Sequence, residues 1–144
     1  MSTAKALAEA LSIPLVAVSR LGVLAHKAGT EAAALDAGRG EFYFRIGESE
    51  ALMRPEEVGK CLDEAGADSP VTGGSLAVCE ESAAKLFSRA VSVDPPTAAD
   101  ALLYSIPRLL AKDFDDVALI DGNYVRRSDA EIFAKADSGH HRQA

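Results

Sequence analysis

The chain has 144 residues, 48% of them apolar, and a formal net charge of −7. This length suits one domain or two small lobes, and the apolar content excludes a disordered composition. The acidic charge argues against direct binding to nucleic acid, because such a surface gains nothing from counterion release unless a partner supplies basic groups.

The first expected element is a helix with one apolar face, formed by residues spaced at i, i+3, i+4 and i+7: Ala4, Leu7, Ala8 and Leu11. Ser12-Ile13-Pro14 ends this helix. The continuous apolar run Leu15–Val18 then predicts a strand buried on both faces. A second helix is expected over 21–28 and closed by Gly29.

Three antiparallel strands are predicted next, over 32–36, 41–47 and 48–53. Between the first two lies a tight hairpin containing Asp36, Gly38, Arg39 and Gly40. An acid, an arginine and two glycines at one tip could form an active-site loop or only a turn. We favour the turn, because aspartate can accept hydrogen bonds from its own turn amides and no nucleophile or base accompanies the pair.

Helices and strands alternate in the rest of the chain. The expected elements are a helix over 55–65 closed by Gly66, a strand over 70–72, a helix over 80–90, a strand over 91–93 and a helix over 97–112. Thr97 and Asp100 suit a capping box at the start of the last helix, and Pro107 should kink it. From residue 32 the order is therefore β-β-β-α-β-α-β-α, which suits the ribonuclease-H-like lobe of actin-like ATPases.

Other chemically suggestive residues favour structural readings. Cys61 and Cys79 are too far apart for a CxxC motif, and we interpret both as free thiols in helical stretches, typical of the reducing cytosol. His26 suits a helix C-terminus, and His140-His141 lies in a polar tail without a third ligand. With no phosphate-loop motif, no cofactor and no metal site are expected.

The N-terminus lacks the basic start and apolar core of a signal peptide, and no apolar run reaches membrane-spanning length. We therefore expect a cytoplasmic protein without a membrane partner.

Four stretches resemble one family. TAKALAEALSIPLVAVS is similar to its "ATAKGLALALGIPLVGVS", LDAGRGEFYF to "ALDARRGEVYWA", MRPEEVGKCL to "LSPEEL", and YVRRSDAEI to "YLRRSDAE". The family is TsaB, also called YeaZ, the glycoprotease-like partner in bacterial synthesis of threonylcarbamoyladenosine on tRNA. The opening "ILAIDTS" strand and the "GPGSFTGLR" segment of the family are absent here.

The resemblance implies a division of the chain. Residues 1–29 are expected to be a helix–strand–helix remnant of the N-terminal lobe, and 30–135 the ribonuclease-H-like C-terminal lobe with its tail. Residues 136–144 are expected to be disordered. Within the tail, Tyr124–Arg127 should pack back on the domain, so that deletion from Tyr124 onward would lower thermal stability.

The resemblance also implies a non-catalytic scaffold or partner subunit. The catalytic relative TsaD holds a metal with two histidines, whose positions correspond here to Arg20 and Leu24. Neither side chain can ligate a metal, so no catalytic residue is expected. Expected partners are a TsaD-like catalytic subunit and a TsaE-like ATPase. An active glycoprotease-like hydrolase or ATPase and a dimeric binding module unrelated to tRNA remain the alternatives.

The expected partner interface is the apolar face of the first helix together with the following strand. Its residues are Ala4, Leu7, Ala8, Leu11 and Val16. Without most of the N-terminal lobe these side chains would be exposed, and an exposed apolar stripe marks a partner surface. We therefore expect a homodimer in which residues 1–28 pair with, or exchange onto, a second copy.

Overall fold

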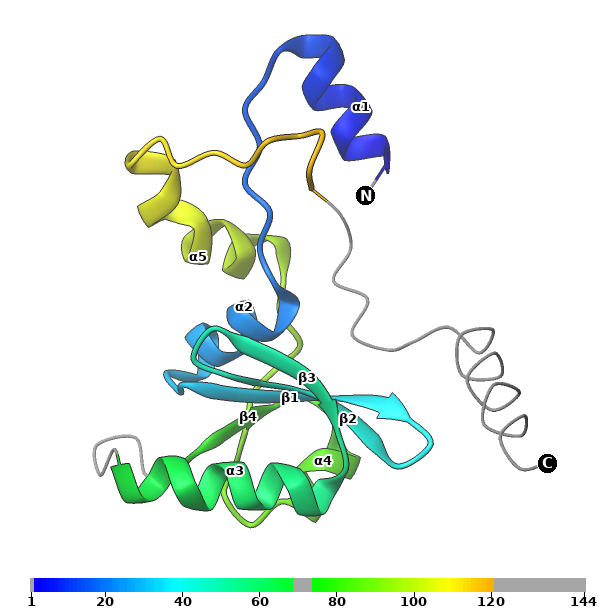
Figure 1. Ribbon diagram of the computed structural model, residues 1–144, viewed down its shortest axis with the longest axis vertical. Helices are drawn as coiled ribbons and strands as arrows, with labels where there is room; N and C mark the ends of the chain where they lie inside the picture. Colours follow the sequence, from blue (N-terminus) through cyan, green and yellow to red (C-terminus); the bar gives the residue numbers. More distant parts are fainter. Residues whose placement is uncertain (1, 69–73, 121–144) are drawn as a thin grey trace, which may run out of the picture.

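The computed structural model describes residues 2–68 and 74–120. A five-stranded sheet forms the body, with helices on both of its faces, and the first helix projects away from one end (Figure 1). The predictions for residues 70–72, for the tail from 124 and for His140-His141 lie outside the described residues.

The helices and strands are α1 (Ser2–Leu11), α2 (Arg20–Ala28), β1 (Ala32–Gly38), β2 (Glu41–Ile46), β3 (Ser49–Met53), α3 (Pro55–Asp68), β4 (Leu76–Val78), α4 (Glu81–Leu86), β5 (Ala90–Ser92) and α5 (Ala98–Leu110). From residue 32 onward they follow the predicted order, with β4 later in the chain than the predicted 70–72. The strand order in the sheet is β3-β2-β1-β4-β5, antiparallel over the first three strands and parallel from β1 to β5. This arrangement confirms the ribonuclease-H-like α/β fold.

The alternation of side chains along β1 builds two cores. Ala32 and Ala34 face a core that α3 and α4 cover, where Phe42 and Phe87 meet edge to face with ring centres 5.1 Å apart. Ala33 and Leu35 point to the opposite face, which α2 covers. Small residues on β1 allow both layers to approach the sheet closely, since each face of the strand is fully packed.

Several helix and strand boundaries differ from the predicted ones. The α3 helix continues through Gly66 to Asp68, because the first two turns and their buried stripe outweigh the weak helix propensity of one glycine. The α4 helix is shorter than predicted and ends at Leu86, whose side chain is exposed. Cys79 follows β4 instead of lying in a helix, and both cysteines are half-buried free thiols.

The predicted strand over residues 15–18 is wrong. The segment joining α1 to α2 makes a single antiparallel bridge, between Leu15 and Asp115, and Ala17 is exposed. An apolar run becomes a strand only where neighbouring strands can take up its backbone groups, and no strand of the described sheet lies beside it.

Among residues 2–68 and 74–120, no helix combines the length and the apolar character needed to cross a bilayer.

Candidate partner interface

The hairpin residues serve a turn. Gly38, Arg39 and Gly40 all have positive φ, between 58° and 77°, and Asp36 Oδ1 accepts a hydrogen bond from Gly38 N at 2.7 Å. The second carboxylate oxygen, Oδ2, accepts from Ser82 Oγ at 3.2 Å. Both oxygens are therefore engaged in fixing the backbone of the hairpin and the start of α4.

Arg20 and Leu24, which correspond to the two metal-binding histidines of the catalytic relative, do not form a metal site. Arg20 is exposed at the start of α2, whereas Leu24 is fully buried in the core beneath it. The two side chains thus point to different environments. Across the part of the chain that the structure describes, no group of three or more His, Cys, Asp or Glu side chains could hold a metal ion.

A cavity of about 350 Å³ lies beside Arg20, between the start of α2 and strands β2 and β3. Two of its lining groups are engaged with each other: the Ser19 hydroxyl donates to Glu50, and Glu50 Oε1 also lies 2.9 Å from Arg45 Nη1. Burial lowers the pKa of Arg45, but the bonds to Glu50 and Glu48 outweigh this effect and the net shift is upward. The cluster therefore joins β2 to β3 through ion pairs across the hairpin.

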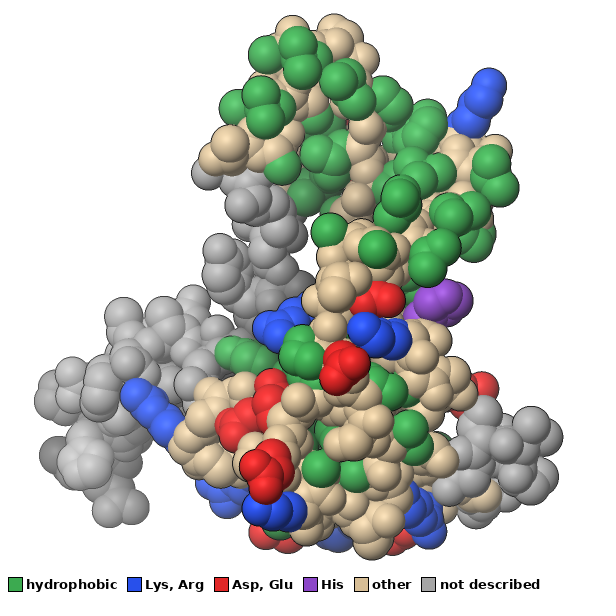
Figure 2. Space-filling view, turned by 180° about the vertical axis from the view of Figure 1, so that it is seen from behind, with side chains coloured by type: hydrophobic (Ala, Val, Ile, Leu, Met, Phe, Trp, Pro, Cys, Tyr) green, Lys and Arg blue, Asp and Glu red, His purple; other side chains and the backbone are tan. Residues whose placement is uncertain are grey.

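The most unusual surface lies over α1 and α5, where Figure 2 shows hydrophobic side chains gathered at one end of the molecule. We call this the α1/α5 surface. Its exposed residues are Leu7, Leu11, Ile13, Leu102, Leu103, Ile106, Leu109, Leu110, Phe114 and Leu119. Exposed apolar side chains gathered at one end of a molecule mark a site of protein–protein contact.

Unlike an ordinary surface helix, α5 does not turn its most apolar side toward the body of the protein. The side facing the body has the spacing i, i+3, i+4, i+7 and consists of Ala101, Tyr104, Ser105 and Arg108, all buried or half-buried. The leucines lie on the remaining sides, and Leu110 is 80% exposed. A surface helix normally buries its apolar stripe, so α5 is arranged to present leucines to something else.

The body-facing side of α5 packs closely on α2. A Cβ built on Gly22 would lie 2.7 Å from the Tyr104 hydroxyl oxygen, so glycine is what lets Tyr104 reach α2. The Tyr104 ring also contacts His26, with ring centres 5.4 Å apart. These contacts fix α5 with its leucines outward.

The predicted interface residues fall into three groups. Ala4, Leu7 and Leu11 are exposed on α1. Ala8 is buried, contrary to the prediction, on the side where Lys5 Nζ donates to the carbonyl oxygen of Ile120 at 2.6 Å. Val16 is half-buried in the segment that runs down to α2. The segment after α5 thus returns to α1 and covers one side of it, which the sequence alone did not indicate.

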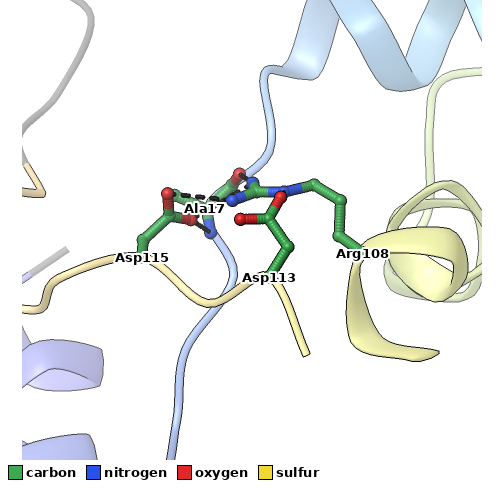
Figure 3. A network of polar contacts seen from close by, with 4 residues as sticks. All are labelled: Ala17, Arg108, Asp113 and Asp115. Atoms are coloured by element: carbon green, nitrogen blue, oxygen red, sulfur yellow. Dashed lines mark hydrogen bonds and ion pairs between the residues drawn. The ribbon is translucent and has the colours of Figure 1, made fainter. Parts of the chain in front are cut away.

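Arg108 and Asp115 form a polar clamp around the backbone of Ala17, in the segment that joins α1 to α2 (Figure 3). Asp115 Oδ2 accepts a hydrogen bond from Ala17 N at 2.7 Å, and Arg108 Nη1 donates to Ala17 O at 3.1 Å. The two side chains also pair with each other, Nη2 to Oδ1 at 3.0 Å, and Asp115 N donates to Leu15 O at 2.9 Å. The clamp therefore satisfies backbone groups that the predicted strand would have bonded to a sheet.

The charged groups of the clamp stabilise one another. The hydrogen bond from Arg108 is the main cause that lowers the pKa of Asp115, and the bond from Ala17 N adds to it. Asp113 completes the group, since its Oδ2 accepts from Arg108 Nε at 2.7 Å. Each nitrogen of the guanidinium thus has an oxygen partner.

Comparison with known proteins finds solved structures of similar fold. No protein-family model and no curated protein matches the chain. A Pseudomonas aeruginosa structure described as an uncharacterized protein with similarity to peptidase YEAZ has a TM-score of 0.58 at 22% identity, covering 87% of this chain and 65% of its own. YeaZ from the same organism has a TM-score of 0.53 at 23% identity, covering 82% and 62%.

The chain spans less than two thirds of the length of those two structures. At such identities the likeness is one of fold. The chain has the α/β fold of YeaZ, the family also called TsaB.

Proposed function

We propose that this chain is a non-catalytic partner subunit of the TsaB type, in an assembly that makes threonylcarbamoyladenosine on tRNA. The observation that carries the proposal is the orientation of α5, which buries Ser105 and exposes Leu102, Leu103 and Leu110. The exposed leucines of α1 lie at the same end of the molecule. The YeaZ-like fold and the resemblance of four sequence stretches support the choice of assembly.

The proposed occupant of the α1/α5 surface is a TsaD-like catalytic subunit, with a TsaE-like ATPase as the further member. A subunit that presents two leucine-bearing helices suits a partner offering apolar helices of its own, because such faces interlock by side-chain packing. In this proposal residues 1–29 correspond to the end of the family's first lobe and 30–135 to its second. The net charge of −7 suits a subunit that leaves tRNA contact to its partners.

A hydrolase is the second candidate, since one structure of the same fold is described by its similarity to a peptidase. Against it, Ser19 and Ser82 bond to carboxylates, Glu50 and Asp36, and neither hydroxyl has a histidine partner among the described residues. Acyl transfer by serine ordinarily needs a base to remove the hydroxyl proton.

Co-expression tests the proposal. The tagged chain is expected to capture a TsaD-like subunit from the same source, and Leu103→Glu in α5 should reduce the captured amount at least tenfold. Leu86→Glu is the matched control, because Leu86 is 53% exposed against 59% for Leu103 but lies on α4, across the sheet. No capture by the unaltered chain, or equal loss with both variants, would contradict the proposal. Peptide or ATP turnover by the purified chain, abolished by Ser82→Ala or Ser19→Ala, would favour the hydrolase.

A further inference from the structure

We propose that Arg108 and Asp115 are positioning residues, which grip the backbone of Ala17 and so fix the position of α1 relative to α5, the two helices that carry the docking surface. Neither residue would touch the partner. The partner readout of this inference rests on the proposed function, whereas the grip itself can be measured on the chain alone.

The first step concerns how α1 is attached. Figure 1 shows α1 set apart from the sheet and joined to α2 by an extended segment, which the segment after α5 crosses. The described polar attachments are few: Lys5 Nζ to Ile120 O, the Leu15–Asp115 bridge, and the clamp on Ala17. The placement of α1 therefore depends on α5 and the segment after it, not on the cores of the sheet.

The second step concerns what the clamp recognises. A carboxylate oxygen accepts the N–H of Ala17 and a guanidinium nitrogen donates to the C=O of the same residue. This is the donor and acceptor pair that a neighbouring strand would present, supplied here by two side chains. The exposed methyl group of Ala17 takes no part, so the grip should be independent of the side chain at this position but require its N–H.

The third step concerns how rigidly the clamp is held. Arg108 lies on the body-facing side of α5, its Nε is occupied by Asp113, and its Nη2 by Asp115. On the other side of Ala17, the Ser19 hydroxyl is bonded to Glu50 and accepts from Gly22 N. Val18 is thus the one residue between the anchored residues Ala17 and Ser19. The direction in which α1 leaves the body is therefore set at Val18.

The test compares Ala17→Pro, which deletes the N–H, with Ala17→Ser, which keeps it. A third variant, Arg108→Ala, deletes the donor. Hydrogen exchange of the amides of residues 15–18 and of α1 is measured on the full chain, together with the radius of gyration in solution. Ala17→Pro and Arg108→Ala should accelerate exchange in α1 at least tenfold and leave β1 and β2 unchanged, whereas Ala17→Ser should match the unaltered chain. The same variants are then tested for capture of the TsaD-like subunit, where the first two should lose at least tenfold.

The outcomes separate the two claims. Unchanged exchange in α1 with both Ala17→Pro and Arg108→Ala would overturn the grip, whatever the partner does. Faster exchange with undiminished capture would overturn the positioning role. Faster exchange in a chain that captures nothing even when unaltered would support the grip while refuting the proposed function. If Arg108→Ala unfolds the whole chain, exchange in β1 will also become faster. The comparison of Ala17→Pro with Ala17→Ser then decides whether the grip exists.

Discussion

Lys27 Nζ lies 2.8 Å from Asp100 Oδ2, and this contact joins the last turn of α2 to the first turn of α5. The same carboxylate oxygen accepts from Thr97 N and Thr97 Oγ1, so the predicted capping box and an inter-helix ion pair share one acceptor. The arrangement fixes where α5 begins relative to α2.

The Asp100 carboxylate should make stability depend on pH. The hydrogen bonds from Lys27 and Thr97 lower the pKa of Asp100 from 3.8 to about 2. A carboxyl group whose folded pKa is depressed stabilises the fold above its unfolded pKa and loses that contribution as the pH falls through the folded pKa. The difference in unfolding midpoint between the unaltered chain and Asp100→Asn should therefore be constant above pH ~5 and shrink as the pH falls from about 4 to about 2.

The control is Lys60→Met, which removes an exposed lysine of α3. It should leave the pH dependence of the midpoint unchanged, whereas Lys27→Met should weaken it. A difference between the unaltered chain and Asp100→Asn that persists at pH ~2 would show that the ion pair does not produce the effect.

The buried pair Arg45–Glu50 should be the most sensitive polar contact of the sheet. Their side chains are 8% and 9% exposed, and the nitrogen–oxygen distance is 2.9 Å. Arg45→Met would leave the carboxylate of Glu50 buried without its cation, which should cost roughly 3–5 kcal/mol of unfolding free energy. Adding Glu50→Leu to the same chain should recover part of that loss.

Chemical denaturation measures all of these variants, with Glu48→Gln as the control. Glu48 also pairs with Arg45, at 3.0 Å, but its side chain is 94% exposed. Loss of an exposed pair costs about 0–1 kcal/mol. Equal losses for Arg45→Met and Glu48→Gln would mean that burial does not govern this pair.

Two glycines with similar backbones should respond differently to alanine. Gly29 and Gly74 have φ of 67° and 66°, where an L side chain costs roughly 1–2 kcal/mol. A Cβ on Gly29 would meet nothing within 4 Å, whereas one on Gly74 would lie 2.6 Å from the backbone oxygen of Leu62. Gly74→Ala should therefore cost about 1–3 kcal/mol more than Gly29→Ala, because the backbone of α3 cannot give way cheaply. Similar thermal midpoints for the two variants would contradict this account.

Local signals predicted much of the fold. The alternation of Phe42, Phe44 and Ile46 places them on the face covered by α3 and α4, and Gly29 ends α2 in the left-handed conformation. Thr97 and Asp100 form both bonds of the capping box. In each of these places the residues that decide the structure lie within a few positions of one another, so a short stretch of sequence is sufficient.

The candidate interface was harder to predict, because it depends on contacts between distant residues. Leu15–Val18 reads as a strand, but the backbone of Ala17 is bonded to Arg108 and Asp115, which lie 91 and 98 positions later. The leucines of α5 predict an amphipathic helix yet do not show which side packs on α2; Tyr104 against Gly22 decides that. Ala8 was assigned to the exposed face because nothing in the sequence indicated that the segment ending at Ile120 returns to α1.

Self-association is the last prediction, and it follows from the leucines of the α1/α5 surface. Without its proposed partner the chain should form a two-fold dimer through this surface, because burying one leucine is worth roughly 1.5–3 kcal/mol and several are uncovered on each copy. Leu7→Glu and Leu103→Glu should each shift the dimer toward monomer in light scattering across a concentration series, and Leu86→Glu should not. None of the three should lower the thermal midpoint of the monomer much, since each replaces an exposed side chain. A chain that stays monomeric at high concentration would leave the TsaD-like subunit as the sole proposed occupant, whereas a dimer indifferent to Leu7→Glu and Leu103→Glu would place the contact elsewhere on the molecule.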